Sequence, residues 1–149
     1  MLPEVLRGGS SAPSVHLATF PEPDPRWDDA ELKERWDQLL KVRTSVQAEL
    51  EVQRRDKKIG APLEAKVTIE ANPDRYKLLK SYEDNLPALF IVSQVELKPV
   101  AHLPHGPDFS VKVEKSGENK CERCWNYRAA VGTFADHLTL CDRCVEAIR

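Results

Sequence analysis

Four cysteines stand in two pairs near the C-terminal end of a chain of 149 residues. They are Cys121, Cys124, Cys141 and Cys144, and the sequence contains no others. The thiols of each pair are separated by two residues. Both can therefore reach one ion from a single tight turn, and two such turns complete the tetrahedron that Zn²⁺ prefers. Because four protein ligands leave no coordination position for water, we predict one Zn²⁺ with a structural role.

Disulfide bonding is the main competing interpretation of these cysteines. A reducing cytoplasm disfavours disulfides, and a thioredoxin-like C-x-x-C motif would not explain a second pair. The segment between the pairs has almost no apolar core of its own, so zinc would supply most of its folding energy, about 10–16 kcal/mol in zinc-finger peptides. Within that segment the alternation of Leu138, Thr139 and Leu140 predicts a short strand. We interpret His137 as a solvated loop residue, since four thiolates already complete the site.

A tryptophan directly follows the first cysteine pair, in the string "KCERCWNY". Two interpretations of it stay open. As a structural residue, it would cover the thiolates as an apolar lid. As a functional residue, an aromatic ring among cations suits an unpaired loop of a nucleic acid, whose bases splay out and stack on side chains. The candidate nucleic-acid contacts at this end of the chain are Lys120, Arg123, Trp125, Tyr127 and Arg128.

A second group of cations lies further upstream: Arg54, Arg55, Lys57 and Lys58, with only Asp56 among them. The simpler interpretation is a solvated helix end whose positive charges complement the helix dipole. The alternative is a patch that contacts phosphates. The chain as a whole carries a net charge of −2, so nucleic-acid binding would depend on a local patch rather than on a generally basic protein.

The elements that must position these groups begin with an extended linker over residues 1–27, rich in Gly, Ser and Pro. A long amphipathic helix is predicted over residues 28–60, where Asp28 and Glu31 resemble a capping box. Its apolar stripe consists of Leu32, Trp36, Leu39, Val46 and Leu50. The sequence offers only one such helix, so we expect this stripe to lack a bundle and the chain to self-associate.

A small α+β module is predicted over residues 61–115, in the order strand, helix, strand, strand. The string "LEAKVTIE" alternates as a half-buried strand does, and Asn72 and Pro73 are suited to begin a helix. We assign residues 88–97 to a buried central strand and residues 109–113 to the last strand. A four-cysteine zinc ribbon or finger over residues 116–149 would complete an α+β chain.

The composition excludes several classes of protein. Charged residues make up 31% of the sequence, and no apolar run approaches the roughly 20 residues needed to span a bilayer. The first residues lack the apolar stretch of a signal peptide, which favours a cytoplasmic protein. We find no Gly-rich phosphate loop, nucleophile elbow or carboxylate pair framed by a histidine, so no catalytic residue is predicted.

Taken in order, these segments resemble the C-terminal part of bacterial-type isoleucyl-tRNA synthetases. The resemblance rests on "SVHLATFP", on the pattern from Trp36 through Gly60, on "LEAKVTI", and on "KCERCWNY" with "LCDRCVEAI". It implies the end of the anticodon-binding helical domain, a small α+β module and a zinc-binding terminus similar to the finger of formamidopyrimidine-DNA glycosylases. By this resemblance the four cysteines are zinc ligands.

The resemblance also implies partners and limits. The parent enzymes join isoleucine to its tRNA using ATP, so isoleucine-accepting tRNA and the remaining synthetase domains are the expected partners. The "HIGH"- and "KMSKS"-type signatures of the catalytic domain do not occur in this sequence. We therefore expect the chain alone not to activate an amino acid, and ATP to be used only by the catalytic domain of the parent.

Three functions of different classes follow from the sequence. The first, which the resemblance favours, is a tRNA-binding appendage of a ligase. The second is a DNA-binding finger of the repair-glycosylase type, and the third is a protein-interaction module in which zinc only stabilises the terminus. Preference for tRNA or for DNA separates the first two, and an absence of nucleic-acid binding would indicate the third.

Overall fold

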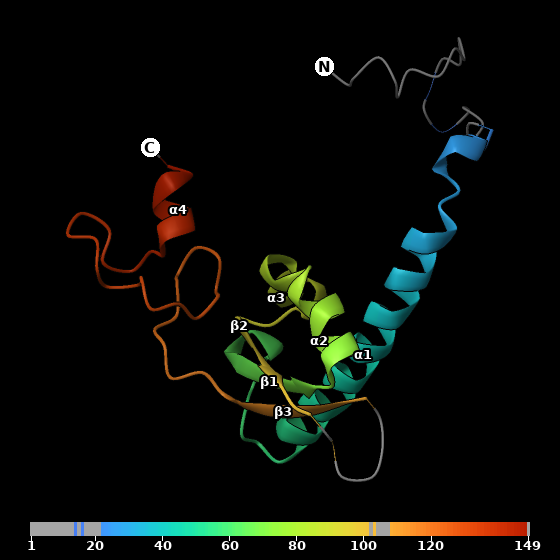
Figure 1. Cartoon of the computed structure of the whole chain (residues 1–149). Coiled ribbons are helices and arrows are strands. Elements are labelled where there is room, and N and C mark those ends of the chain that lie inside the picture. Colours follow the sequence, from blue (N-terminus) through green and yellow to red (C-terminus); the bar gives the residue numbers. More distant parts are fainter. Residues whose placement is uncertain (1–13, 15, 17–21, 102, 104–107, 149) are drawn as a thin grey trace. The chain divides into compact units, whose positions relative to one another are not determined.

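The computed structural model describes residues 14, 16, 22–101, 103 and 108–148, so much of the predicted linker lies outside the described residues. Its helices and strands, in chain order, are α1 (Ala30–Arg55), β1 (Ala65–Ala71), α2 (Pro73–Lys80), α3 (Leu86–Phe90), β2 (Gln94–Pro99), β3 (Phe109–Lys115) and α4 (Asp142–Glu146) (Figure 1). Short 3₁₀ turns occur at Pro25–Trp27, Pro62–Glu64 and Glu83–Asn85. Helices combined with one small sheet confirm the predicted α+β class. No helix in the described part of the chain is long and apolar enough to cross a membrane.

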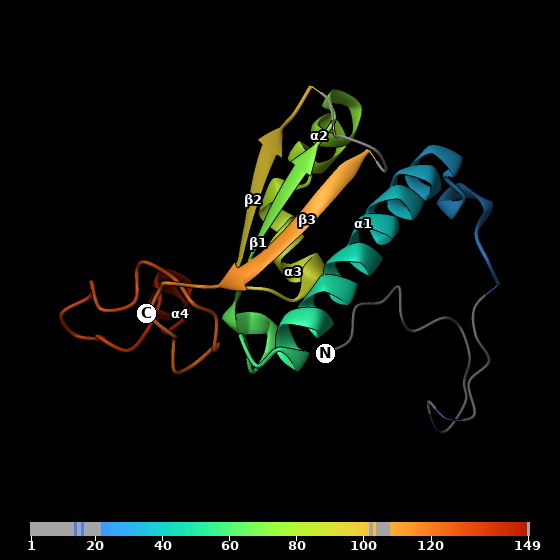
Figure 2. The same cartoon turned by 90° about the horizontal axis from the view of Figure 1, so that it is seen from below.

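The sheet has three strands in the order β2-β1-β3, with β1 in the middle (Figure 2). Strand β1 runs parallel to β2 and antiparallel to β3, and Val67 is paired with Val95 on one side and with Val113 on the other. Residues directly opposite one another on neighbouring strands point to the same side, so these three valines share one face of the sheet. Ala65, Val67 and Ile69 of β1 are fully buried, as the alternation in "LEAKVTIE" predicts, and Ala71 at the end of the strand is also fully buried.

The prediction of a central strand over residues 88–97 is wrong. Residues 86–90 form helix α3, and only the end of the predicted segment belongs to a strand, β2, which lies at an edge of the sheet. Pro87 lies in the first turn of α3, where its missing N–H is not needed. Ile91 then ends the helix with a left-handed backbone, φ 60°. A short apolar run is compatible with either a buried helix or a buried strand, which is why its pattern misled the assignment.

Helix α2 begins as the sequence predicts. The side chain of Asn72 accepts a hydrogen bond of 2.9 Å from the backbone N–H of Arg75, and Pro73 occupies the first turn. The helix packs on the sheet through Leu79, which is fully buried. It ends at Lys80, and Leu86 is the first residue of the next helix, α3.

The start and end of the long helix differ from the prediction. Helix α1 begins at Ala30, and Asp29 is the residue that accepts a 2.8 Å hydrogen bond from the backbone N–H of Leu32. Asp28 instead ends the preceding 3₁₀ turn, so the predicted capping box is wrong. The helix ends at Arg55, and two residues later Lys57 has a positive φ of 58°.

Helix α1 finds a packing partner within the chain. Its side chains Leu39, Val42, Val46 and Leu50 are buried in one cluster with residues of the sheet, α2 and α3. The expectation that the stripe requires helices absent from the sequence is therefore wrong for these residues. Leu32 and Trp36, also in the predicted stripe, are each 40% exposed, although Trp36 lies 6.3 Å from Tyr82 between ring centroids.

Two arginines connect these elements by polar contacts. Arg43 on α1 donates from Nε to the carbonyl oxygen of Leu89, at 3.0 Å. Arg75 on α2 donates to Gln38 of α1 at 3.0 Å and to Asp108, just before β3, at 2.8 Å. Since the Arg75 side chain is only 11% exposed, these partners satisfy a nearly buried charge.

Candidate metal centre and nucleic-acid interface

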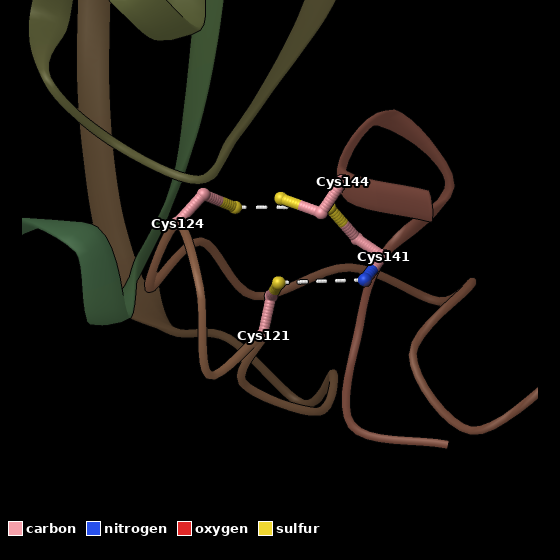
Figure 3. Close-up of side chains that lie close together, drawn as sticks. All are labelled: Cys121, Cys124, Cys141 and Cys144. Carbon is pink, nitrogen blue, oxygen red and sulfur yellow. Dashed lines mark hydrogen bonds between the residues drawn. The ribbon is translucent and has the colours of Figure 1, made fainter. Parts of the chain in front are cut away.

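The four cysteines converge at one point, although sixteen residues separate the two pairs (Figure 3). Their sulfur atoms all lie within 4.8 Å of one another, and the Sγ atoms of Cys124 and Cys141 are 3.7 Å apart. A tetrahedron with Zn–S bonds of about 2.3 Å has edges of about 3.8 Å. Cys121, Cys141 and Cys144 are fully buried, while Cys124 is partly exposed. The donor set and its spacing thus fit one structural Zn²⁺, with all four positions filled by protein.

The first pair of cysteines is held by a narrow loop. Lys120 and Tyr127 form an antiparallel bridge at its base. Within the loop the N–H of Cys121 donates to the carbonyl of Asn126 at 2.9 Å, and the N–H of Trp125 donates to the carbonyl of Cys121 at 2.8 Å. The side chain of Asn126 donates to the carbonyl of Cys124 at 3.1 Å. Sequence reasoning missed this supporting role of Asn126, whose only signal is an amide residue within a turn.

The second pair comes from the start of α4. Cys141 occupies the N-cap position of this short helix and Cys144 lies inside it. The backbone N–H of Cys141 donates to the sulfur of Cys121 at 3.3 Å, which connects the two pairs (Figure 3). Val131 and Leu140 pack against the cysteines as a small apolar cluster. Such a cluster is too small to fold on its own, which agrees with a fold that depends on metal.

The thiols differ in their tendency to ionise. Burial alone would raise the pKa of Cys121, but hydrogen bonds from the backbone of Cys124, Cys141 and Arg123 outweigh it and lower the pKa to about 6. Burial raises the pKa of Cys141 to about 12, with neighbouring thiols adding to the effect. Thiolates this close together repel one another, so a cation at their centre is needed for all four to be ionised.

The predicted strand over Leu138, Thr139 and Leu140 is wrong. These residues form a turn, in which the N–H of Leu140 donates to the carbonyl of His137 at 3.1 Å. The N–H of Glu122 donates to the carbonyl of Thr139 at 3.0 Å, so the turn supports the first cysteine loop. Among the residues that the structure describes, the metal-binding cluster contains the four cysteines and not His137.

Trp125 does not form a lid over the thiolates. Its side chain is 61% exposed, and the cluster around the cysteines is formed by other residues. The ammonium nitrogen of Lys120 lies 5.3 Å from the centroid of its ring, which is the geometry of a cation–π contact. Lys120 and Trp125 are thus brought together on the surface of the first cysteine loop.

The other candidate contacts on the finger differ in their environments. Arg123 is exposed on the same loop. The backbone N–H of Tyr127 donates to the hydroxyl of Ser93 at 2.7 Å, so this residue helps to attach the finger to the α+β module. Arg128 lies 3.4 Å from a carboxylate oxygen of Asp142, and its Nε is buried without a hydrogen-bond partner among the described residues. Only Lys120, Arg123 and Trp125 are exposed members of this set.

The cations at the end of α1 are also unequal. Arg54 forms an ion pair with Glu51 at 2.8 Å, and Lys58 forms one with Asp56 at 3.4 Å. Arg55 and Lys57 are exposed, and within the described part of the chain neither has a carboxylate partner. Half of the predicted patch is therefore already neutralised by neighbouring side chains.

The geometry of the four sulfurs and the short loops around them is that of a zinc finger. Residues 118–147 match the protein family described as "Zinc finger found in FPG and IleRS". All four predicted ligands fall inside this match, so the class of the metal centre is a structural zinc finger of this family.

The chain also has relatives over most of its length. It is 46% identical over 147 residues to the isoleucine–tRNA ligase of Syntrophotalea carbinolica, 43% over 145 residues to that of Brachyspira hyodysenteriae, and 40% over 144 residues to that of Geobacter sulfurreducens. These alignments cover 94%, 95% and 93% of the chain, but only 16% of each relative. The chain is thus homologous to the C-terminal region of isoleucine–tRNA ligases, which confirms the resemblance found in the sequence.

Proposed function

We propose that the chain is a tRNA-binding, zinc-stabilised portion of an isoleucine–tRNA ligase, and that it contacts the anticodon region of isoleucine-accepting tRNA in the cytoplasm. The relatives are named for joining isoleucine to tRNA. In the proposed function, the joining reaction with ATP belongs to the remaining domains of such a ligase, which are the partners of this chain. The contribution of this chain is binding, and its zinc holds a fold rather than performing chemistry.

The observation that carries the proposal is the exposed Trp125 with Lys120 beside it. Sequence-specific recognition of RNA mostly uses unpaired bases, which stack on aromatic side chains, and an anticodon loop supplies such bases. A tryptophan buried in a core could not take this role, whereas this ring is open to solvent on a loop fixed by zinc ligands. Arg123, exposed on the same loop, adds a positive charge for the phosphate backbone.

A second contribution to the proposal comes from the end of α1. Phosphate contacts add affinity that does not depend on base sequence and that weakens with salt. Arg54, Arg55, Lys57 and Lys58 are all exposed and lie close together in the sequence. We assign to this patch the general attraction for tRNA, and to the Trp125 loop the contact with bases.

The proposal is tested by titrating the zinc-loaded chain with isoleucine tRNA. Stacking of a base on an aromatic ring contributes roughly 1–3 kcal/mol, so Trp125→Ala is expected to weaken binding by about 5- to 150-fold. The slope of log affinity against log salt should stay nearly unchanged, because no phosphate contact is lost. Trp27→Ala is the matched control: this ring is 69% exposed, and its removal should leave tRNA affinity unaltered.

Two outcomes would replace the proposed function by another. If duplex DNA competes as well as tRNA, the DNA-binding interpretation of the finger takes precedence. If the zinc-loaded chain binds no nucleic acid, the finger is a structural or protein-binding module. Either result would contradict the anticodon contact.

A further inference from the structure

The α+β module and the zinc finger have separate apolar cores. The main cluster of buried side chains includes α1, the sheet, α2 and α3, and its last member is Val113. The cluster around the zinc ligands begins at Cys121. Among the described residues the two clusters have no member in common. Because packing between two cores does not hold the finger in one orientation, polar contacts have to do so.

Buried polar residues are found where the finger meets the module. Within the described part of the chain the buried polar residues are Thr68, Ser93 and Ser116. Ser116 directly follows β3, and its backbone N–H donates to the carbonyl of Glu64 at 2.7 Å. Its hydroxyl accepts a hydrogen bond of 3.2 Å from the backbone N–H of Glu118. These contacts hold the segment through which the chain enters the finger.

Ser93 makes a second contact between the module and the finger, away from that connecting segment. Its hydroxyl donates to the carbonyl of Leu63 in the module, at 2.5 Å. The same oxygen accepts a hydrogen bond of 2.7 Å from the backbone N–H of Tyr127. Tyr127 is bridged to Lys120 at the base of the first cysteine loop. The hydroxyl of Ser93 therefore connects the module directly to the backbone of that loop.

This hydroxyl satisfies one backbone group on each side of the junction. Without it, the carbonyl of Leu63 and the N–H of Tyr127 would both lose a hydrogen-bond partner. A backbone group without a partner gains by turning toward water, which favours movement of the finger away from the module. The attachment at residues 116–118 would then serve as a pivot, since it is the covalent link between the two parts.

We propose that Ser93 is a positioning residue, which fixes the orientation of the first cysteine loop relative to the α+β module. This inference rests on the proposed function and deepens it. In that function one tRNA is contacted by the loop and by the basic patch at residues 54–58, which lies on the module side of the junction. Two contacts held at a fixed separation bind together more tightly than two contacts that must be ordered on binding.

The first test measures the motion of the two parts without RNA, by ¹⁵N relaxation of the zinc-loaded chain. In the parent chain, backbone amides of residues 118–147 and of the sheet should report the same rotational correlation time. In Ser93→Ala, the amides of residues 118–147 should report a shorter time than those of the sheet. The variant should keep one zinc, because Ser93 contacts none of the four cysteines by a hydrogen bond.

Two further variants serve as controls for the hydroxyl. Ser110 is an exposed serine on β3 whose hydroxyl lies 3.4 Å from a carboxylate oxygen of Glu70, so Ser110→Ala should behave as the parent chain. Ser93→Thr keeps a hydroxyl and should restore a single correlation time. If Ser93→Thr behaves as Ser93→Ala does, the hydroxyl is not the cause and the proposal is wrong.

The second test is titration of the same variants with isoleucine tRNA. Ser93→Ala should weaken binding by about 10-fold, as expected when preorganisation of one of two contacts is lost. The slope of log affinity against log salt should stay unchanged, since no phosphate contact is removed. Ser110→Ala and Ser93→Thr should bind as the parent chain does.

The two tests distinguish failure of the positioning role from failure of the proposed function. If the parent chain binds no tRNA, the proposed function fails, whereas the relaxation measurement still decides whether Ser93 orients the finger. Equal correlation times in Ser93→Ala, or unaltered affinity of this variant for tRNA that the parent binds, would overturn the positioning role. Loss of zinc in Ser93→Ala would overturn it as well, because Ser93 would then support the folding of the finger.

Discussion

Cys124 is the partly exposed member of the zinc cluster, whereas the other three cysteines are fully buried. Its replacement therefore disturbs packing least and tests the metal most directly. Metal analysis of the purified chain should give one zinc per molecule, and Cys124→Ser should reduce this value strongly. Because zinc supplies most of the folding energy of so small a unit, we also expect residues 116–148 to become sensitive to protease in the variant.

His137 provides the control for this experiment. It is the histidine nearest in sequence to the second pair, yet it lies outside the cluster of sulfurs. His137→Ala should keep its zinc. A Cys124→Ser variant that retains both metal and protease resistance would show that the four-cysteine site is wrongly assigned.

At this scale, spacing alone is enough to predict the cluster of cysteines. Two residues between thiols allow one geometry that joins both to an ion, so the prediction follows from ligand chemistry. The orientation of Trp125 could not be predicted in the same way. It depends on a positive φ within a loop, and loop dihedrals leave no periodic pattern in the sequence. The ring of Tyr127 and the charge of Arg128 predict nucleic-acid contacts, whereas their contacts with Ser93 and Asp142 depend on the fold.

Among the elements, α1 offers a matched pair of neighbouring leucines. Leu39 is fully buried in the main core, and Leu40 is 44% exposed. Leu39→Ala should lower the free energy of unfolding by about 2–5 kcal/mol, as expected for a cavity in a packed core. Leu40→Ala should change it by less than about 0.5 kcal/mol, as is usual at exposed positions. Urea denaturation measures both, and equal effects would mean that α1 does not pack on the module as described.

The end of α3 supplies a second element-level prediction. Ile91 has a φ of 60° and is 53% exposed, an unfavourable conformation for a β-branched side chain. Asparagine adopts this conformation more easily and occurs at helix ends for that reason. Ile91→Asn should therefore raise the free energy of unfolding by about 0.5–1 kcal/mol, a gain typical of compatible helix-cap substitutions. A loss of stability in urea denaturation would show that the Ile91 side chain makes a contact that offsets the strain.

Strand β1 and helices α1 and α2 show how much of the fold local sequence patterns can predict. The strand at residues 65–71 and the helix after Asn72 follow from local signals, because alternation and capping are properties of adjacent residues. The partner of α1 is not a local property. Its apolar stripe indicates one buried face. Only the fold shows that the α+β module covers this face, and that Val42 belongs to it.

For the whole molecule, the distribution of charge leads to a prediction about salt. Arg55 and Lys57 have no carboxylate partner within the described part of the chain, whereas Arg54 and Lys58 are paired. Each phosphate contact that is lost should lower the salt slope of tRNA binding by about 0.7–0.9, depending on strand form. We expect Arg55→Gln with Lys57→Gln to flatten the slope more than Arg54→Gln with Lys58→Gln does. An unchanged slope in both variants would remove the end of α1 from the interface.

The central claim is that Trp125 touches RNA, and the most direct test observes the indole itself. The chain contains three tryptophans, Trp27, Trp36 and Trp125, whose indole N–H signals can be assigned by NMR after replacing each with phenylalanine. On addition of the anticodon stem–loop of isoleucine tRNA to the zinc-loaded chain, the Trp125 signal should shift strongly while those of Trp27 and Trp36 stay in place. If the stem–loop binds and the Trp125 signal does not move, base recognition by this loop is contradicted.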